Sequence, residues 1–181
     1  LLVASPSVAA PAISQVAENA GKLEVSADAD KAFQTIKGEG FEVQFDMKQG
    51  TINKLVYGGE SVIVPGYGPR LNAFRAFVSN DNWCYQPWFA NGLHNLKHHA
   101  ENAQVIKEKN GNVKITCTVV SQAPNAARLQ SKNGRYDSGI HTLEENTDRP
   151  FGADDFKFTT NQVWTIYPDG SIELQAAITS N

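Results

Sequence analysis

Hydrophobic and polar residues alternate along much of this chain. In GFEVQFD, Phe41, Val43 and Phe45 point to one side of an extended strand, and the polar residues between them point to the other. Alternation with a period of two is typical of a strand with one buried face. The next residues, DMKQG, end in Gly50, which suits a hairpin turn, and TINKLVYGG supplies the returning strand. We expect ESVIV to form a further strand.

Two more hairpins follow from the same pattern. NAQVIKE and NVKITCTVVS flank the turn KNGN. NQVWTI and SIELQAAITS flank the turn Pro168-Asp169-Gly170, and the second of these strands alternates at Ile172, Leu174, Ala176 and Ile178. Strands joined by hairpins, without alternating helices, predict an all-β fold, an antiparallel β-sandwich.

Two segments depart from this pattern. Between Ser121 and Phe156 the chain shows little alternation and many turn-forming residues, which predicts a long loop that is functional, disordered or made of short pieces. QPWFANGLHNLKHH is the one helix candidate, and Gly92 limits it to a turn or two.

Length and composition narrow the class of protein. The 181 residues suit one domain, or one domain with a tail, and 41% of them are hydrophobic. The net charge of −3 gives no basic face for nucleic acid, and no apolar run is long enough to span a membrane, so we expect neither partner. The opening LLVASPSVAAPA resembles the end of a secretory signal but lacks a Met and a positive region, so we interpret it as an internal start.

The two cysteines leave their pairing open. Cys84 and Cys117 are able to form a disulfide, but Cys117 lies on an alternating strand, where a buried free thiol is more common.

The histidines and carboxylates give weak signals for chemistry. His94 and His98 are four residues apart and His99 follows, yet no acidic third ligand is suitably spaced, so we expect a polar helix face and no metal. The acidic residues of the long loop show no apolar setting that would raise a carboxyl pKa, so we expect no pair of glycosidase carboxylates; they are Glu144, Glu145, Asp148, Asp154 and Asp155.

Two other kinds of catalytic or binding motif are equally weak. Asp137, Ser138 and His141 lie too close in sequence for a typical triad, and no G-x-S-x-G elbow is present. No glycine-rich phosphate loop precedes a helix, and we expect no cofactor.

The richest chemistry lies in LNAFRAFVSNDNWCYQPWFANGLHNLKHH, which begins at Leu71. We expect Arg75 to lie on a strand and to pair with Asp81, the nearest acid, because a partly buried guanidinium needs a partner. Asn80 and Asn82 are expected to tie the loop to its own backbone. Aromatic rings and amides also form sugar-binding surfaces. We favour core packing for most of the rings.

Three segments in order resemble a known family. PRLNAFRAFVSNDN resembles the segment N-x-x-R-A-P-x-D-N-D of the C-terminal domain of glycoside hydrolase family 2 β-galactosidases. GEGFEVQFDMKQGTINKLVYGGESVI is similar to the hairpin that opens that domain, and VWTIYPDGSIELQAAI is similar to a later hairpin. The resemblance covers residues 24–181 and implies the N-terminal portion of a galactose-mutarotase-like supersandwich. Residues 1–23 would then be a linker or the tail of a preceding immunoglobulin-like domain.

The resemblance also implies a function. The catalytic glutamates of such enzymes lie in a separate TIM-barrel domain, so this chain would be a non-catalytic domain beside that barrel and its galactoside substrate. The matching loop residues, which approach the active-site mouth in the family, are Arg75, Ala76, Asn80 and Asp81, followed by Asn82. Phe77 and Ser79 replace the family's Pro and first Asp, and WCYQPW replaces a flexible loop. Candidates to face the sugar or the barrel are Trp83, Tyr85 and Trp88. The aromatic loop resembles the Bacteroides-like branch, which implies the periplasm or export.

Two other functions stay open. An independent carbohydrate-binding module would bind sugar through an exposed aromatic platform. An aldose mutarotase would need a His acid and a Glu base, for which His141 with Glu144 or Glu145 is the one candidate. An incomplete sandwich would also expose strand edges, which predicts dimerisation through them.

Overall fold

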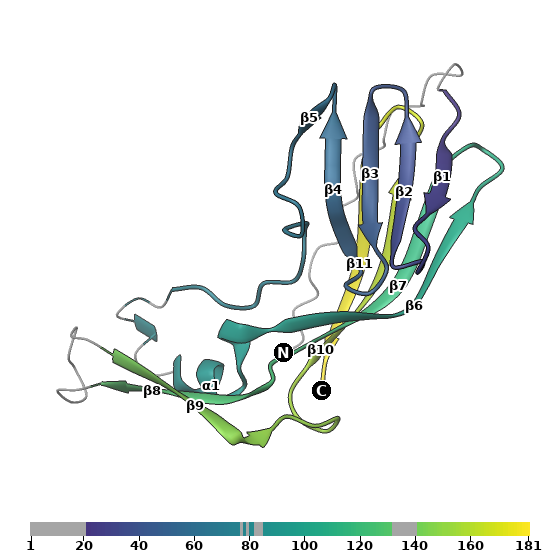
Figure 1. Ribbon diagram of the computed structural model, residues 1–181. Helices are drawn as coiled ribbons and strands as arrows, with labels where there is room; N and C mark the ends of the chain where they lie inside the picture. Colours follow the sequence, from purple (N-terminus) through teal and green to yellow (C-terminus); the bar gives the residue numbers. More distant parts are fainter. Residues whose placement is uncertain (1–20, 77, 79, 82–84, 132–140) are drawn as a thin grey trace, which may run out of the picture.

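The computed structural model describes residues 21–76, 78, 80–81, 85–131 and 141–181, and its centre is a pair of facing antiparallel sheets (Figure 1). Five strands pair in sequence order in the first sheet: β1 (Glu24–Ala27), β2 (Phe33–Gly38), β3 (Phe41–Asp46), β4 (Thr51–Tyr57) and β5 (Glu60–Ser61). The second sheet has the order β11-β10-β7-β6 and contains β6 (Lys97–Lys107), β7 (Val113–Gln122), β10 (Phe158–Ile166) and β11 (Ile172–Ser180).

The alternation along β3 is confirmed, because its apolar side chains are buried between the sheets. Val43 and Phe45 are fully buried, and the turn to β4 follows directly. Asp46 fixes that turn by accepting hydrogen bonds from the backbone N–H groups of Lys48 and Gln49, at 2.8 and 2.9 Å. Gly50 completes the turn with a φ of 69°, a conformation that other residues adopt with strain.

The core joins the two sheets through large side chains. The ring of Phe45 on β3 meets Trp164 on β10 edge to face, with 5.7 Å between their centroids. Strand β7 alternates strictly between buried and half-buried residues, and Cys117 on it is a buried free thiol, as expected. Burial raises the pKa of this thiol to about 11. The predicted all-β antiparallel sandwich is therefore confirmed.

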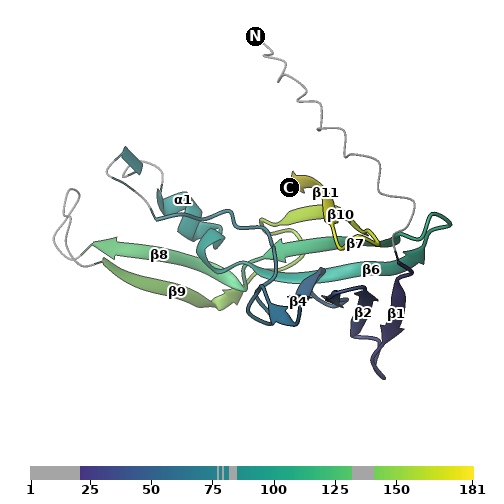
Figure 2. The ribbon, with the colours of Figure 1, turned by 90° about the horizontal axis from the view of Figure 1, so that it is seen from above.

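A second body, which we call the arm, projects from the sandwich between β7 and β10 (Figures 1 and 2). Its hairpin consists of β8 (Asn125–Ser131) and β9 (His141–Pro150), and α1 (Tyr85–Ala90) and η2 (Leu93–Asn95) lie beside it. The prediction of a long irregular loop over this region was wrong. Strand β9 from Thr142 onward is exposed on both faces, so its sequence carries no alternation that would mark it as a strand.

The helix candidate forms the expected turn or two, whereas the last strand of the first sheet is shorter than expected. Helix α1 ends before Gly92, whose φ is 67°, and β6 begins at Lys97, so His98 lies on a strand and shares no helix face with His94. Strand β5 covers only two residues of ESVIV. Residues 62–76 continue as a segment without regular secondary structure, the strap, which is held to β4 by hydrogen bonds from Val62 N to Leu55 O and from Gly66 N to Asn53 O, each 2.9 Å.

Candidate functional site

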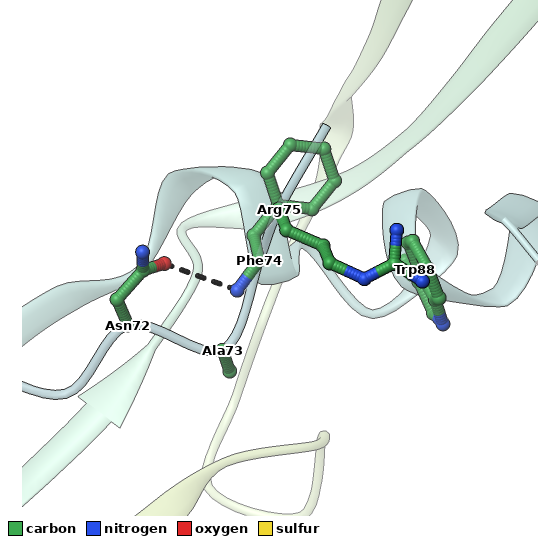
Figure 3. Close-up of a pocket in the computed structure, with 5 residues that line it drawn as sticks. All are labelled: Asn72, Ala73, Phe74, Arg75 and Trp88. Carbon is green, nitrogen blue, oxygen red and sulfur yellow. Dashed lines mark hydrogen bonds between the residues drawn. The ribbon is translucent and has the colours of Figure 1, made fainter. Parts of the chain in front are cut away.

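The site begins where the strap meets the arm. The side chain Oδ1 of Asn72 accepts a hydrogen bond from the backbone N–H of Phe74 at 3.0 Å, which turns the chain locally (Figure 3). From this turn the side chain of Arg75 extends to Trp88 on α1 (Figure 3). No strand is formed over residues 71–76, so the predicted strand at Arg75 was wrong.

The predicted ion pair between Arg75 and Asp81 is confirmed. The guanidinium donates two hydrogen bonds to the carboxylate, Nη1 to Oδ2 at 2.6 Å and Nη2 to Oδ1 at 2.9 Å. The backbone N–H of Val78 donates a third to Oδ2 at 2.8 Å. Asp81 is buried while Arg75 stays largely exposed. The Arg75 guanidinium, and next the Val78 N–H, hold the pKa of the Asp81 carboxyl below its usual range.

The guanidinium also covers one ring of the helix. The Cζ atom of Arg75 lies 5.4 Å from the centroid of the Trp88 ring, within the range of a cation–π contact. Trp88 meets Phe74 edge to face at 6.3 Å. An open pocket of about 510 Å³ lies here, lined by Asn72, Ala73, Phe74, Arg75 and Trp88 (Figure 3). An amide, a cation and an aromatic ring around one hollow suit a polar molecule with an apolar face.

Other rings of the predicted aromatic cluster pack the arm together. Phe89 is buried with Leu129 and Ala127 of β8, and Phe74 and Tyr85 pack against this group. The Gln86 amide adds a hydrogen bond to the Leu129 carbonyl at 2.7 Å. Tyr85 therefore contributes to the packing of the arm.

The remaining predicted site residues fall in three groups. Ala76 and Asn80 are exposed to solvent. Asp81 closes the loop that contains them by accepting a hydrogen bond from the backbone N–H of Val78. Asn82, Trp83 and Cys84 lie outside the described residues, as do Asp137 and Ser138. His141 begins β9, and Glu144 and Glu145 follow on the same strand as exposed residues.

Sequence reasoning missed one contact, between His94 and Glu145. The His94 ring lies 5.0 Å from Phe89 and 6.1 Å from Phe74, and neither of its buried nitrogens has a hydrogen-bond partner. Its Nε2 is 3.9 Å from the Glu145 Oε1, longer than a hydrogen bond. Burial lowers the pKa of His94, although Glu145 opposes this effect. No sequence signal links these residues, because the hairpin that brings them together was not predicted.

Metal binding and membrane crossing are two other functions that a site in the described residues could serve. No three His, Cys, Asp or Glu side chains among them gather closely enough to hold a metal ion. His98 instead makes a 2.8 Å hydrogen bond through Nδ1 with the Ser121 Oγ on β7. Within the same part of the chain, no helix is long and apolar enough to cross a membrane.

Fold and site together define an all-β sandwich domain that carries an arm with an arginine and aromatic pocket. Comparison with protein families matches residues 37–180 to the family described as the β-galactosidase small chain. This match spans well over half of the sequence, and the chain belongs to that family. A search of curated proteins found no match.

Proposed function

We propose that this chain is a non-catalytic domain of a glycoside hydrolase family 2 β-galactosidase. In this proposal the arm helps to shape the active-site mouth formed with a TIM-barrel domain, and the fold is the beginning of a galactose-mutarotase-like supersandwich. Membership of the small-chain family makes other domains of the same enzyme plausible partners. The observation that carries the proposal is the Arg75 pocket, which lies between the strap and helix α1 of the arm and is open to solvent.

The pocket has chemistry suited to a position beside a sugar. Two hydrogen bonds to Asp81 fix the Arg75 guanidinium in place. Holding it over Trp88 therefore costs little additional side-chain conformational entropy. Asn72 adds an amide at the rim, and Phe74 adds an apolar wall. Planar donors beside a ring match the mixed polar and apolar faces of a galactoside.

The test is steady-state kinetics of the intact β-galactosidase that contains this chain. Trp88→Ala and Arg75→Lys should each lower kcat/KM for β-galactoside hydrolysis by about tenfold, because both disturb the mouth without touching the catalytic carboxylates. Val64→Ala is the matched control, since Val64 is an exposed residue of the same strap and lies outside the pocket. Unchanged kcat/KM in both pocket variants would contradict the proposal.

A second experiment separates this function from an independent carbohydrate-binding module. Calorimetric titration of the chain alone with galactose and lactose should give no saturable heat at millimolar sugar, because the pocket supplies only one side of the proposed site. Saturable binding that Trp88→Ala abolishes would instead favour the binding module.

A further inference from the structure

The imidazole of His94 lies directly behind the wall of the pocket. Its ring meets Phe74, which lines the pocket, edge to face at 6.1 Å, and lies 5.0 Å from Phe89 in the apolar cluster of the arm. Both ring nitrogens are buried, and neither has a hydrogen-bond partner. A neutral imidazole has one N–H donor and one bare nitrogen acceptor, and leaving both unpartnered in an apolar setting is unfavourable.

One carboxylate lies almost within reach of this ring. The Oε1 atom of Glu145 is 3.9 Å from the His94 Nε2, about 1 Å longer than a charge-assisted hydrogen bond. Glu145 belongs to the face of the hairpin that meets α1, because it lies opposite Ala127, which packs against Phe89. A small movement of η2 or β9 would bring the imidazole and the carboxylate into contact.

The charged groups of the other elements around this imidazole point elsewhere. In the strap, Asp81 binds the Arg75 guanidinium. In β8, Arg128 lies between buried neighbours and is exposed on the opposite face of the hairpin. Helix α1 has no charged side chain, and Tyr85 is its one titratable group. Among the described residues, Glu145 is the charged group that acts on the pKa of this imidazole, and it raises that pKa.

We propose that His94 and Glu145 form a pH-sensitive switch that changes the shape of the pocket. When His94 binds a proton, the 3.9 Å approach closes into a salt bridge, and the ring is drawn toward β9 and away from Phe74. Phe74 then shifts, and because it meets Trp88 edge to face at 6.3 Å, the shift reaches a second wall of the pocket. The effect on hydrolysis rests on the proposed function, whereas the switch itself is a property of the arm.

Neutral pH and mild acid therefore favour different forms of the arm. Burial, the larger effect, lowers the pKa of His94 below the ordinary 6.5, and Glu145 offsets part of this decrease. The imidazole is therefore neutral at neutral pH, and closure onto Glu145 follows only as pH falls below 6.5. Because the salt bridge exists only in the protonated form, loss of the Glu145 charge should lower the pKa of His94 further.

Nuclear magnetic resonance of the chain from pH 7.5 to pH 4.5 tests the switch. The His94 ring signals and the Trp88 indole N–H signal should move together, with one midpoint below 6.5. The Trp164 indole donates a 2.8 Å hydrogen bond to Gln162 in the sandwich core, so it is the internal reference and should not follow this midpoint. His94→Phe should abolish the movement of the Trp88 signal.

Two neighbouring carboxylates of β9 give a matched pair of variants. Glu145→Gln should lower the shared midpoint by on the order of one pH unit, because it removes the charge that stabilises the protonated ring. Glu144→Gln is the control and should leave the midpoint unchanged. Glu144 accepts a hydrogen bond from Gln130 at 2.6 Å and lies opposite Arg128 on the other face of the hairpin.

Three results would overturn the proposal. One is a Trp88 signal that stays still while His94 titrates. Another is a Trp88 movement that persists in His94→Phe, which would assign it to another group. The third is an unchanged midpoint in Glu145→Gln, which would mean that the protonated ring turns into water instead of closing onto β9. None of these results bears on the kinetic effects of Trp88→Ala and Arg75→Lys, so the switch and the proposed function are tested separately.

Discussion

His94 shows how one largely buried side chain links two elements of the arm. It lies on η2, packs against Phe89, and reaches within 3.9 Å of Glu145 on β9. Burial lowers its pKa below the ordinary 6.5, so the unfolded chain binds a proton more readily than the folded arm. The free energy of unfolding should therefore fall as pH decreases through 6.5 toward the lower folded pKa.

Urea denaturation from pH 7.5 to pH 5 tests this prediction. His94→Phe removes the titrating group and keeps a ring beside Phe74 and Phe89, so the loss of stability on acidification should become smaller. His98→Phe is a comparison rather than a silent control, because burial also lowers the pKa of His98. His99→Gln removes an exposed imidazole and serves as the surface control. An unchanged pH dependence in His94→Phe would show that His94 contributes nothing to it.

At the scale of the element, the strap depends on one close approach to β4. A Cβ atom at Gly68 would lie 1.8 Å from the Ile52 carbonyl oxygen and 2.9 Å from the Thr51 Oγ1. The same Thr51 hydroxyl donates a hydrogen bond to the Pro69 carbonyl, so a side chain at Gly68 would also disturb that contact. Gly68→Ala should lower the free energy of unfolding by about 1–3 kcal/mol.

Chemical denaturation of Gly68→Ala measures this cost. Gly152→Ala is the matched control, because its nearest neighbour would be the Asp155 Oδ2 at an ordinary 3.9 Å. Equal midpoints for the two variants would show that the strap shifts without cost.

Strands with one buried face could be predicted from the sequence, whereas a strand with both faces exposed could not. Strands β3 and β7 bury every second residue, so apolar and polar residues alternate in their sequence, and this alternation predicts them. Strand β9 buries neither face from Thr142 onward, and its position follows from pairing with β8 instead. At the site, Arg75 and Asp81 were paired correctly because they are close in sequence. His94 and Glu145 come together only because the β8–β9 hairpin forms beside η2, so their contact could not be predicted from the sequence.

At the scale of the whole molecule, the described residues contain two separate apolar clusters. The large one fills the sandwich and includes Phe45 and Trp164, and the small one holds the arm through Phe89, Ala127 and Leu129. A two-stranded sheet on a small cluster is only marginally stable by itself. We expect the arm to open more often than the sandwich without global unfolding.

Native-state hydrogen exchange tests this expectation. Backbone amides of β8 and β9 should exchange faster than those of β3, β7 and β10, and Leu129→Ala should accelerate exchange in the arm alone. Val43→Ala is the counterpart in the sandwich core and should accelerate exchange there and in the arm, because the arm is built on β7 and β10. Uniform exchange across both bodies would show a single cooperative unit.

The separation of the two clusters also bears on how this chain changes over evolutionary time. No described side chain belongs to both clusters, so a substitution in one makes no direct packing demand on the other. The hairpin of the arm leaves the sandwich after β7 and returns at its neighbour β10, while α1 and η2 follow the strap and lead into β6. Descendants of one ancestral gene can therefore lengthen, shorten or rewrite the arm while inheriting the sandwich unaltered.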